Sequence, residues 1–327
     1  MSELALAAFA SERGVHPPAP GRDTRFAAFA RTFDSLAYLA ALERRGVRWL
    51  PRSDPGFPPL LRAVHDAPPG LFVRGGRDAR VLSRPAVAIV GARSCSPYGA
   101  QVARTLGREF GAAGLVVVSG LARGIDGEAH RGALEAGGVT VAVLGCGVDR
   151  DYPASHAELA GRISASGLVV SEYAPAVEPA PWRFPARNRI IAGLAQATVV
   201  VEAGERSGAL ITADFALEEG REVFACPGEI TSTLSAGTNA LLRLGATPLT
   251  EAADVLELYG LRAPEEAEVD LTGPARALLE RLGAPATGDE LVRAVALDPG
   301  MAAAALSELE LAGLVACADG VYRRTRA

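Results

Sequence analysis

Glycine-rich segments that also carry arginine or serine follow several apolar runs in the middle of the chain. They read GARSCSPYG at 91–99, SGLARGID at 119–126, FPARNR at 184–189 and EAGERSGALITA at 202–213. Glycine lets backbone N–H groups approach an anion closely, and a helix N-terminus supplies unpaired donors, as Ser207, Gly208 and Thr212 would. Guanidinium groups add forked donors for phosphate oxygens. The arginines concerned are Arg93, Arg123, Arg187 and Arg189. These residue types together predict a site for a phosphate-bearing ligand.

The usual nucleotide-binding fingerprints are absent. The first segment is GARSCSPYG rather than G-x-G-x-x-G, and the second apolar run leads into SGLARG rather than into an acid that would bind a ribose. No Walker A sequence occurs. We therefore expect neither an NAD enzyme nor a P-loop ATPase, and no cofactor.

Candidate nucleophiles and bases occur, but their spacing assembles no catalytic set. Asp126 and His130 lie four residues apart on one helix face, where Asp126 suits the N-cap and His130 suits packing or hydrogen bonding. Cys146 and Cys226 have no partner base in sequence, and we interpret both as small buried residues. We expect no catalytic residue among them.

Two acidic residues stand at the ends of apolar runs. Glu172 and Glu202 could each orient an arginine or a hydroxyl group, or could form an ordinary ion pair. His16, His65 and His156 lack the spacing of metal ligands, so we expect no metal site.

Trp182 and Phe184 flank Arg183 just before the arginine pair at 187 and 189. Aromatic rings beside arginines suit single-stranded nucleic acid, because a base can stack while its phosphates are bound. The same rings could instead pin a loop over a sheet edge. The spacing favours neither interpretation.

The elements that would position these segments are short β-branched runs. They recur every 24–29 residues or so, each followed by a glycine-rich turn and a helical pattern, which is typical of βα units with strands buried on both faces. The runs are Val87–Val90, Leu115–Val118, Val139–Leu144, Leu168–Val170, Thr198–Val201 and Glu222–Ala225. We predict an α/β fold with a doubly wound, mostly parallel Rossmann-like sheet, whose ligand site lies beyond the carboxyl ends of its strands.

The flanking regions differ from this core. Asp34 is a plausible N-cap for a helix over SLAYLAALERR that stops at Gly46, and proline-rich turns and short extended segments follow. After residue 273 the pattern gives a helix over Pro274–Leu282, a Thr287 N-cap for Gly288–Val295, a helix opened by Pro299, and a hairpin turning at Asp319–Gly320. We predict a helical region over 1–83, the sheet domain over 84–260, a linker over 261–273 and a winged helix over 274–327.

Charge limits what such a site can attract. The chain carries 33 basic residues, all of them arginine, against 38 acidic ones. Residues 1–86 have 13 arginines against 8 acids, residues 87–260 have 13 against 19, and residues 261–327 have 7 against 11. A uniformly basic nucleic-acid binder is excluded, so any anion site must be local. Four scattered cysteines, an acidic Glu3 and no apolar run near the ~20 residues of a membrane span suggest a cytoplasmic protein.

Nine segments resemble the DNA-processing protein A family, also called DprA or Smf, and span about residues 50–250 in order. They are DPGFPPLL, APPGLFVRG, VAIVGARSCSPYG, VVSGLARGIDGEAHRGAL, TVAVLGCGVDRDYP, SEYAP, FPARNRIIAGLA, VVVEAGERSGALITADFALEEGREVFACPG and SAGTNALLRLGA. The resemblance implies a single-stranded DNA-binding recombination mediator that is not an enzyme. Such proteins form homodimers, protect incoming DNA and load the RecA recombinase during natural transformation.

The resemblance also implies roles for individual residues. Arg93, Arg123, Arg187 and Arg189 would hold the DNA backbone. Gly91, Gly120, Gly124 and Asn188 would shape the pocket, Ser207 and Gly208 would close it, and Phe184 would stack on a base. The N-terminal region resembles the family's SAM-like domain only in length and helicity. The C-terminal region resembles a winged helix that many members lack.

Two other functions stay open at this point. A Rossmann-like nucleotide-processing hydrolase of the lonely-guy type would carry PGGxGTxxE with a catalytic glutamate, whereas the chain reads AGERSGALITA there. An oligomeric scaffold would form dimers but retain no DNA. For the DNA-binding function, about four bound phosphates predict how binding depends on salt. A plot of the logarithm of the binding constant against the logarithm of the salt concentration should have a slope near −3, from roughly −0.7 per contact.

The C-terminal region is expected not to bind DNA. A recognition helix needs basic or amide side chains facing the groove. The candidate, PGMAAAALSELELAG, has no Arg, Lys, Asn or Gln and has two glutamates. Packing or protein contact is the role we predict for it.

Overall fold

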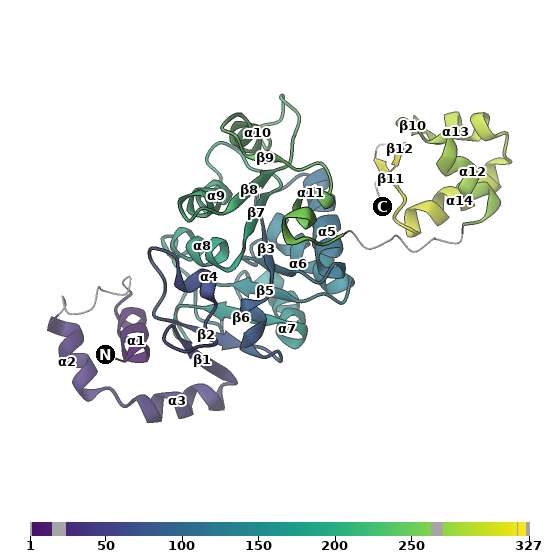
Figure 1. Ribbon diagram of the computed structural model, residues 1–327. Coiled ribbons are helices and arrows are strands. Elements are labelled where there is room, and N and C mark those ends of the chain that lie inside the picture. The colour runs from purple at the N-terminus through teal and green to yellow at the C-terminus, as the bar shows by residue number, and fades with distance from the viewer. Residues whose placement is uncertain (1, 15–23, 263–270, 319, 325–327) are drawn as a thin grey trace. The chain divides into compact units, whose positions relative to one another are not determined.

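The predicted β-branched runs form the centre of a nine-stranded sheet in the computed structural model, which describes residues 2–14, 24–262, 271–318 and 320–324 (Figure 1). The sheet order is β1-β2-β6-β5-β4-β3-β7-β8-β9. Its strands are β1 Val47–Pro51, β2 Gly70–Arg74, β3 Ala86–Val90, β4 Val116–Ser119, β5 Thr140–Val143, β6 Leu168–Ser171, β7 Ala197–Val200, β8 Glu222–Ala225 and β9 Thr247–Pro248. Strands β3 to β9 pair in parallel, so the predicted fold class is confirmed.

Helices cover both faces of this sheet. They are α4 Pro59–Arg62, α5 Pro97–Ala112, α6 Ile125–Glu135, α7 Ala157–Ser166, α8 Arg183–Leu194, α9 Gly208–Glu218, α10 Ala236–Arg243 and α11 Ala253–Leu256, with 3-10 turns η1 Ala79–Ser83, η2 Ala154–His156 and η3 Glu257–Tyr259. Residues of α4, α8 and α9 pack with Ala88 and Val90 of β3, whereas residues of α5, α6 and α11 pack with Val87 and Ile89. Every residue of β3 to β7 is buried, as continuous apolar runs require.

The sheet order reverses at β3. The chain proceeds from β3 through β4 and β5 to β6 on one side, and then crosses to β7 on the other side of β3. The helices that follow β3 and β7, α5 and α9, therefore pack on opposite faces of the sheet. This arrangement leaves a crevice at the carboxyl edge, which is where open parallel sheets bind ligands.

The proline-rich segment contributes more than turns. Strands β1 and β2 pair antiparallel, and β2 then pairs antiparallel with β6, with Phe72 opposite Ser171. The N-terminal helices are α1 Glu3–Arg13, α2 Thr24–Thr32 and α3 Ser35–Arg44. Asp34 caps α3 as predicted, since its carboxylate accepts from the N–H groups of Leu36 and Ala37, each at 3.0 Å.

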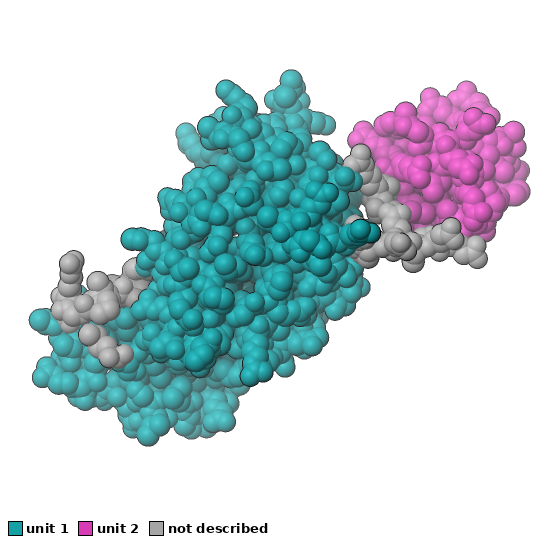
Figure 2. Space-filling model, in the orientation of Figure 1, with its two compact units in different colours: residues 1–264 teal, residues 265–327 magenta. Residues whose placement is uncertain are grey.

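The chain divides into two compact units, residues 1–264 and 265–327 (Figure 2). The second unit contains α12 Gly273–Arg281, β10 Ala286–Thr287, α13 Gly288–Val295, α14 Pro299–Leu311, β11 Val315–Ala318 and β12 Val321–Arg324. Thr287 and Glu290 form a capping box at α13. The predicted turn residue Asp319 and most of the predicted linker lie outside the described residues. The predicted boundary near residue 83 stays a prediction.

The described part of the chain holds neither a candidate membrane-spanning helix nor a candidate metal-binding cluster. None of its helices combines the length and apolar character that crossing a membrane requires. Nor do its His, Cys, Asp and Glu side chains gather in threes at a spacing suited to a metal ion.

Candidate functional site

A cavity of about 450 Å³ lies at the carboxyl edge of the sheet, where the order reverses. It is bordered by the loops after β3, β4 and β7 and by the N-terminal ends of α8 and α9. Nine of the residues singled out from the sequence line it: Gly91, Arg93, Asp126, Phe184, Arg187, Asn188, Ser207, Gly208 and Thr212. The predicted gathering of these loops is therefore seen in the structure.

Backbone contacts bring the loops together. The Ala92 N–H donates to the Glu202 carbonyl at 2.7 Å, and the Ala92 carbonyl accepts from Ile125 N–H at 3.3 Å. Gly124 has φ of +74°, and a Cβ there would overlap the Ala92 carbonyl. A Cβ on Gly91 would lie 2.5 Å from the Ile125 side chain. The two glycines thus permit the close approach on which the cavity wall depends.

Arg187 forms the floor of the cavity. Its Nη1 donates to the Gly120 carbonyl at 2.8 Å and to the Val143 carbonyl, and its Nε donates to Asn188 Oδ1 at 3.1 Å. Only 4% of its surface is exposed. Burial lowers the pKa of this guanidinium, while nearby Asp126 opposes the shift. Gly120 makes room for it, because a Cβ there would lie 2.5 Å from both terminal nitrogens.

Asp126 does not cap α6, so that prediction is wrong. The N-cap is Gly124, and the Asp126 carboxylate instead accepts from the N–H groups of Gly120 at 3.2 Å and Ala122 at 3.3 Å. It therefore fixes the loop after β4 and borders the cavity. Burial raises the pKa of this carboxyl, and the Arg187 guanidinium and the two N–H donors counteract part of that rise.

The N-terminus of α9 forms another wall of the cavity. Ser207 is its N-cap and accepts from the Ala209 N–H at 3.3 Å. Asn188 Nδ2 donates to the Gly208 carbonyl at 3.0 Å and so ties α8 to α9. Arg206, exposed and directly before the cap, also lines the cavity. Arg206 was not predicted from the sequence, although its place directly before the predicted phosphate-holding turn was a usable signal.

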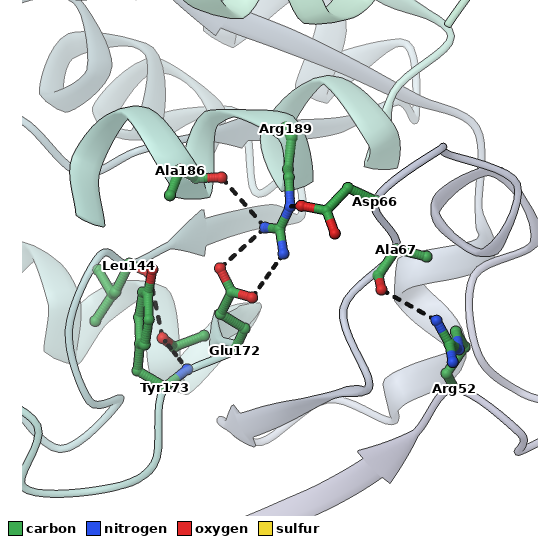
Figure 3. Close-up of polar contacts among 9 residues, drawn as sticks. Arg52, Asp66, Ala67, Leu144, Glu172, Tyr173, Ala186 and Arg189 are labelled. Atoms are coloured by element: carbon green, nitrogen blue, oxygen red, sulfur yellow. Dashed lines mark hydrogen bonds and ion pairs between the residues drawn. The ribbon is translucent and has the colours of Figure 1, made fainter. Parts of the chain in front are cut away.

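Arg189 is not among the residues that line the cavity, and its guanidinium binds two carboxylates instead (Figure 3). Its Nη1 and Nη2 donate to the two oxygens of Glu172 at 2.9 and 2.7 Å, and its Nε donates to Asp66 at 2.8 Å. Burial disfavours the charged guanidinium, but these two carboxylates outweigh burial and raise its pKa. All three guanidinium nitrogens are thus engaged by protein oxygens. Arg189 therefore serves as a structural ion-pair partner and has no free nitrogen to donate to a phosphate.

Arg123 is the fourth arginine singled out from the sequence. It is exposed in the loop after β4, and the residues lining the cavity do not include it. Arg93, by contrast, is exposed at the cavity, and its guanidinium carbon lies 5.1 Å from the centroid of the Phe184 ring. Of the four arginines, the structure brings Arg93 and Arg187 together.

The two aromatic residues beside Arg183 lie in different surroundings. Phe184 is half-buried and lines the cavity. Trp182 is 42% exposed and packs edge-on to Tyr173, with the Arg183 guanidinium 5.0 Å from its ring centroid. Phe184 therefore borders the site, whereas Trp182 packs in an aromatic and arginine cluster next to it.

The remaining titratable candidates are occupied or buried. Cys146 and Cys226 are buried as predicted, and burial raises the pKa of their thiols to about 11 and about 12. His130 is fully buried with its Nδ1 2.7 Å from Thr140 Oγ1, and burial lowers its pKa to about 3. Glu202 accepts from both the N–H and the hydroxyl of Ser96, so it orients a hydroxyl, one of the roles considered for it.

Comparison with known proteins gives matches along both units. The family model described as DNA recombination-mediator protein A matches residues 48–260, and that of the DprA winged helix domain matches residues 262–320. Protein Smf of Escherichia coli (strain K12) is 40% identical over 315 residues, covering 92% of this chain and 83% of that protein.

Two solved structures are similar to this fold. One is DNA processing protein A (DprA) from Streptococcus pneumoniae, with TM-score 0.66 and 37% identity, covering 80% of this chain and 94% of the other. The second, which concerns the single-stranded DNA binding mode of DNA processing protein A from Helicobacter pylori, has TM-score 0.59 and 30% identity, covering 66% and 97%. By the family-model match and the identity to Protein Smf, this chain belongs to the DNA recombination-mediator protein A family.

Proposed function

We propose that the cavity binds the backbone of single-stranded DNA and that the protein is a recombination mediator. In this role a cytoplasmic homodimer protects incoming DNA and loads the RecA recombinase during natural transformation. The observation that carries the proposal is the convergence of Arg93, Arg187 and the α9 N-terminus on one cavity in a net acidic chain. Two guanidinium groups and one helix N-terminus, both of them kinds of phosphate donor, thus meet in one place.

Single-stranded DNA is favoured over a free nucleotide by two features. The description of the similar Helicobacter pylori structure names a single-stranded DNA binding mode of that protein. In this chain Phe184 lies at the cavity wall beside Arg93, which is the pairing of ring and cation that single strands use.

The site is proposed to bind without catalysing. The buried thiols of Cys146 and Cys226 have raised pKa values, which leaves little thiolate at neutral pH. Glu202, which directly precedes the AGERSGALITA segment, accepts hydrogen bonds from the N–H and the hydroxyl of Ser96. No observation favours the nucleotide hydrolase.

The direct test is the affinity of the full chain for an oligothymidine and for a duplex across a range of salt concentrations. Since Arg189 is engaged elsewhere, Arg93, Arg187 and Arg206 remain as cations at the cavity. Three phosphate contacts predict a log–log slope of about −2, shallower than the value expected from four. Arg93→Ala should weaken binding to all sequences alike and reduce the slope by about 0.7. A full chain that retains no oligothymidine at low salt would refute the proposal.

A further inference from the structure

Three side chains form a column at one wall of the cavity. The Phe184 ring has the Arg93 guanidinium carbon 5.1 Å from its centroid, and the Tyr152 ring stacks on it with centroids 5.3 Å apart and planes 24° apart. Gly145 leaves space for this arrangement, because a Cβ there would lie 3.0 Å from the Phe184 ring. Phe184 is therefore already contacted by a cation and by a second ring.

The exposed ring of the column is Tyr152. Of its surface 41% is exposed, whereas Phe184 is half-buried. Phe184 lines the cavity, and Tyr152 is absent from the lining. The aromatic surface thus continues from the cavity wall outward, toward the loop after β5.

That loop is tied down by the segment after β6. Asp149 Oδ1 accepts from Ala176 N–H at 2.7 Å, and Arg150 Nη2 donates to the Ala176 carbonyl at 3.2 Å. The Tyr152 N–H then donates to the Arg150 carbonyl at 3.1 Å. The backbone of Tyr152 is thus anchored while its ring remains accessible, which limits the entropy lost when a ligand packs on it.

We infer that Tyr152, backed by Phe184, is the stacking face for a nucleobase of single-stranded DNA just outside the cavity. This inference rests on the proposed function. A DNA phosphate held near Arg93 would place a neighbouring base against the exposed ring of Tyr152. The base would then extend the stack formed by Phe184 and Tyr152. Because every base has a π face, the contact adds affinity without selecting a sequence.

Anisotropy measurements with the full chain test this role. One probe is a labelled oligothymidine of about 20 nucleotides, longer than typical single-module sites, and the other is the same backbone with abasic positions throughout. Tyr152→Leu removes the ring but keeps apolar bulk, and Tyr152→Phe keeps the ring. Tyr98→Leu is the matched control, since Tyr98 is 58% exposed and does not line the cavity.

Tyr152→Leu should weaken oligothymidine binding by about 5- to 150-fold, the range of one base–aromatic contact. Its affinity for the abasic backbone and its salt slope should match those of the unaltered chain, because no phosphate contact is lost. Tyr152→Phe and Tyr98→Leu should bind oligothymidine as the unaltered chain does. In the unaltered chain, photo-crosslinking with 5-iodouracil in the oligomer should modify the peptide containing Tyr152, and this readout does not depend on the folding of a variant.

Two results would overturn the role of Tyr152. One is unchanged oligothymidine affinity in Tyr152→Leu, and the other is an equal loss on both probes, which would make Tyr152 a support for Phe184 only. Failure of the proposed function looks different. In that case the unaltered chain binds neither probe, or Arg93→Ala leaves affinity and salt slope unchanged.

Discussion

Arg187 and Arg189 lie two residues apart on α8 and have opposite surroundings. Residues at this spacing differ by about 200° around a helix, so both guanidinium groups cannot face one cavity. Arg187 points beneath Gly120 at the cavity floor, and Arg189 binds Glu172 and Asp66 on the other side. From the sequence both arginines were predicted to lie at the strand ends. The helical geometry leaves Arg187 at the cavity and directs Arg189 to a structural ion pair.

Arg189→Ala is predicted to act on stability. It would leave Glu172, which is 2% exposed, as a buried carboxylate without its bidentate partner. Breaking a buried pair in this way costs about 3–5 kcal/mol of unfolding free energy. Urea unfolding measures the loss, and the salt slope of oligothymidine binding should stay at the unaltered value under conditions where the variant is folded. A slope reduced by about 0.7 would instead return Arg189 to the DNA contacts.

His130 makes stability depend on pH. The unfolded chain binds a proton at this histidine below about pH 6.5, whereas the folded protein binds it only near pH 3. The unfolded state therefore holds more protons between these values, so stability falls as the pH drops from 6.5 toward 3.

His130→Gln should flatten this decline by up to about 1.4 kcal/mol per pH unit, measured by urea unfolding between pH 7 and pH 5. In the unaltered protein, the His130 ring resonances should not shift over the same range. A His130 titration midpoint near pH 6 would contradict the prediction.

At the scale of elements, the six β-branched runs form β3 to β8, each bound lying within one residue of its prediction. These strands are local apolar signals, which a sequence reveals directly. The pairing of β2 with β6 could not be predicted, because Phe72 and Ser171 are far apart in the chain. Asp126 was misassigned for a related reason, since the backbone of Gly124 is shaped by its contact with the loop after β3.

Packing of α5 on α6 gives an element-scale prediction. A Cβ on Gly132 of α6 would overlap the Arg104 carbonyl of α5, and the helix backbone cannot yield. Gly132→Ala should therefore lower the unfolding free energy by about 1–3 kcal/mol, as overpacking does. The control is Gly161→Ala in α7, where nothing lies within 4 Å and the better helix propensity of alanine should add about 0.5–1 kcal/mol. Opposite signs in thermal or urea unfolding would confirm the packing, and equal signs would contradict it.

At the scale of the whole molecule, the net negative charge opposes long-range attraction of DNA, so that DNA binding would depend on local arginines. The chain is net −5, and the part containing the cavity has 13 arginines against 19 acids. Long-range steering of a polyanion should be weak, so affinity would rest on contacts within a Debye length of about 8–10 Å. Composition alone could exclude a basic binder but could not locate the cavity, whose cations come from three separate loops and helices.

The second unit provides a test of whether DNA affinity rests on the cations at the cavity alone. Helix α14, the third helix of that unit, has the sequence PGMAAAALSELEL, and its polar side chains are one serine and two glutamates. Such a helix offers a DNA groove no cation and no amide, and the glutamates would repel phosphates. We therefore predict that a chain ending at residue 262 binds oligothymidine with the affinity and salt slope of the full chain. Anisotropy titrations of the two chains at physiological salt measure this, with residues 271–327 alone as the third sample. Tenfold weaker binding by the shortened chain, or micromolar binding by the isolated unit, would show instead that the C-terminal unit contributes to the DNA path.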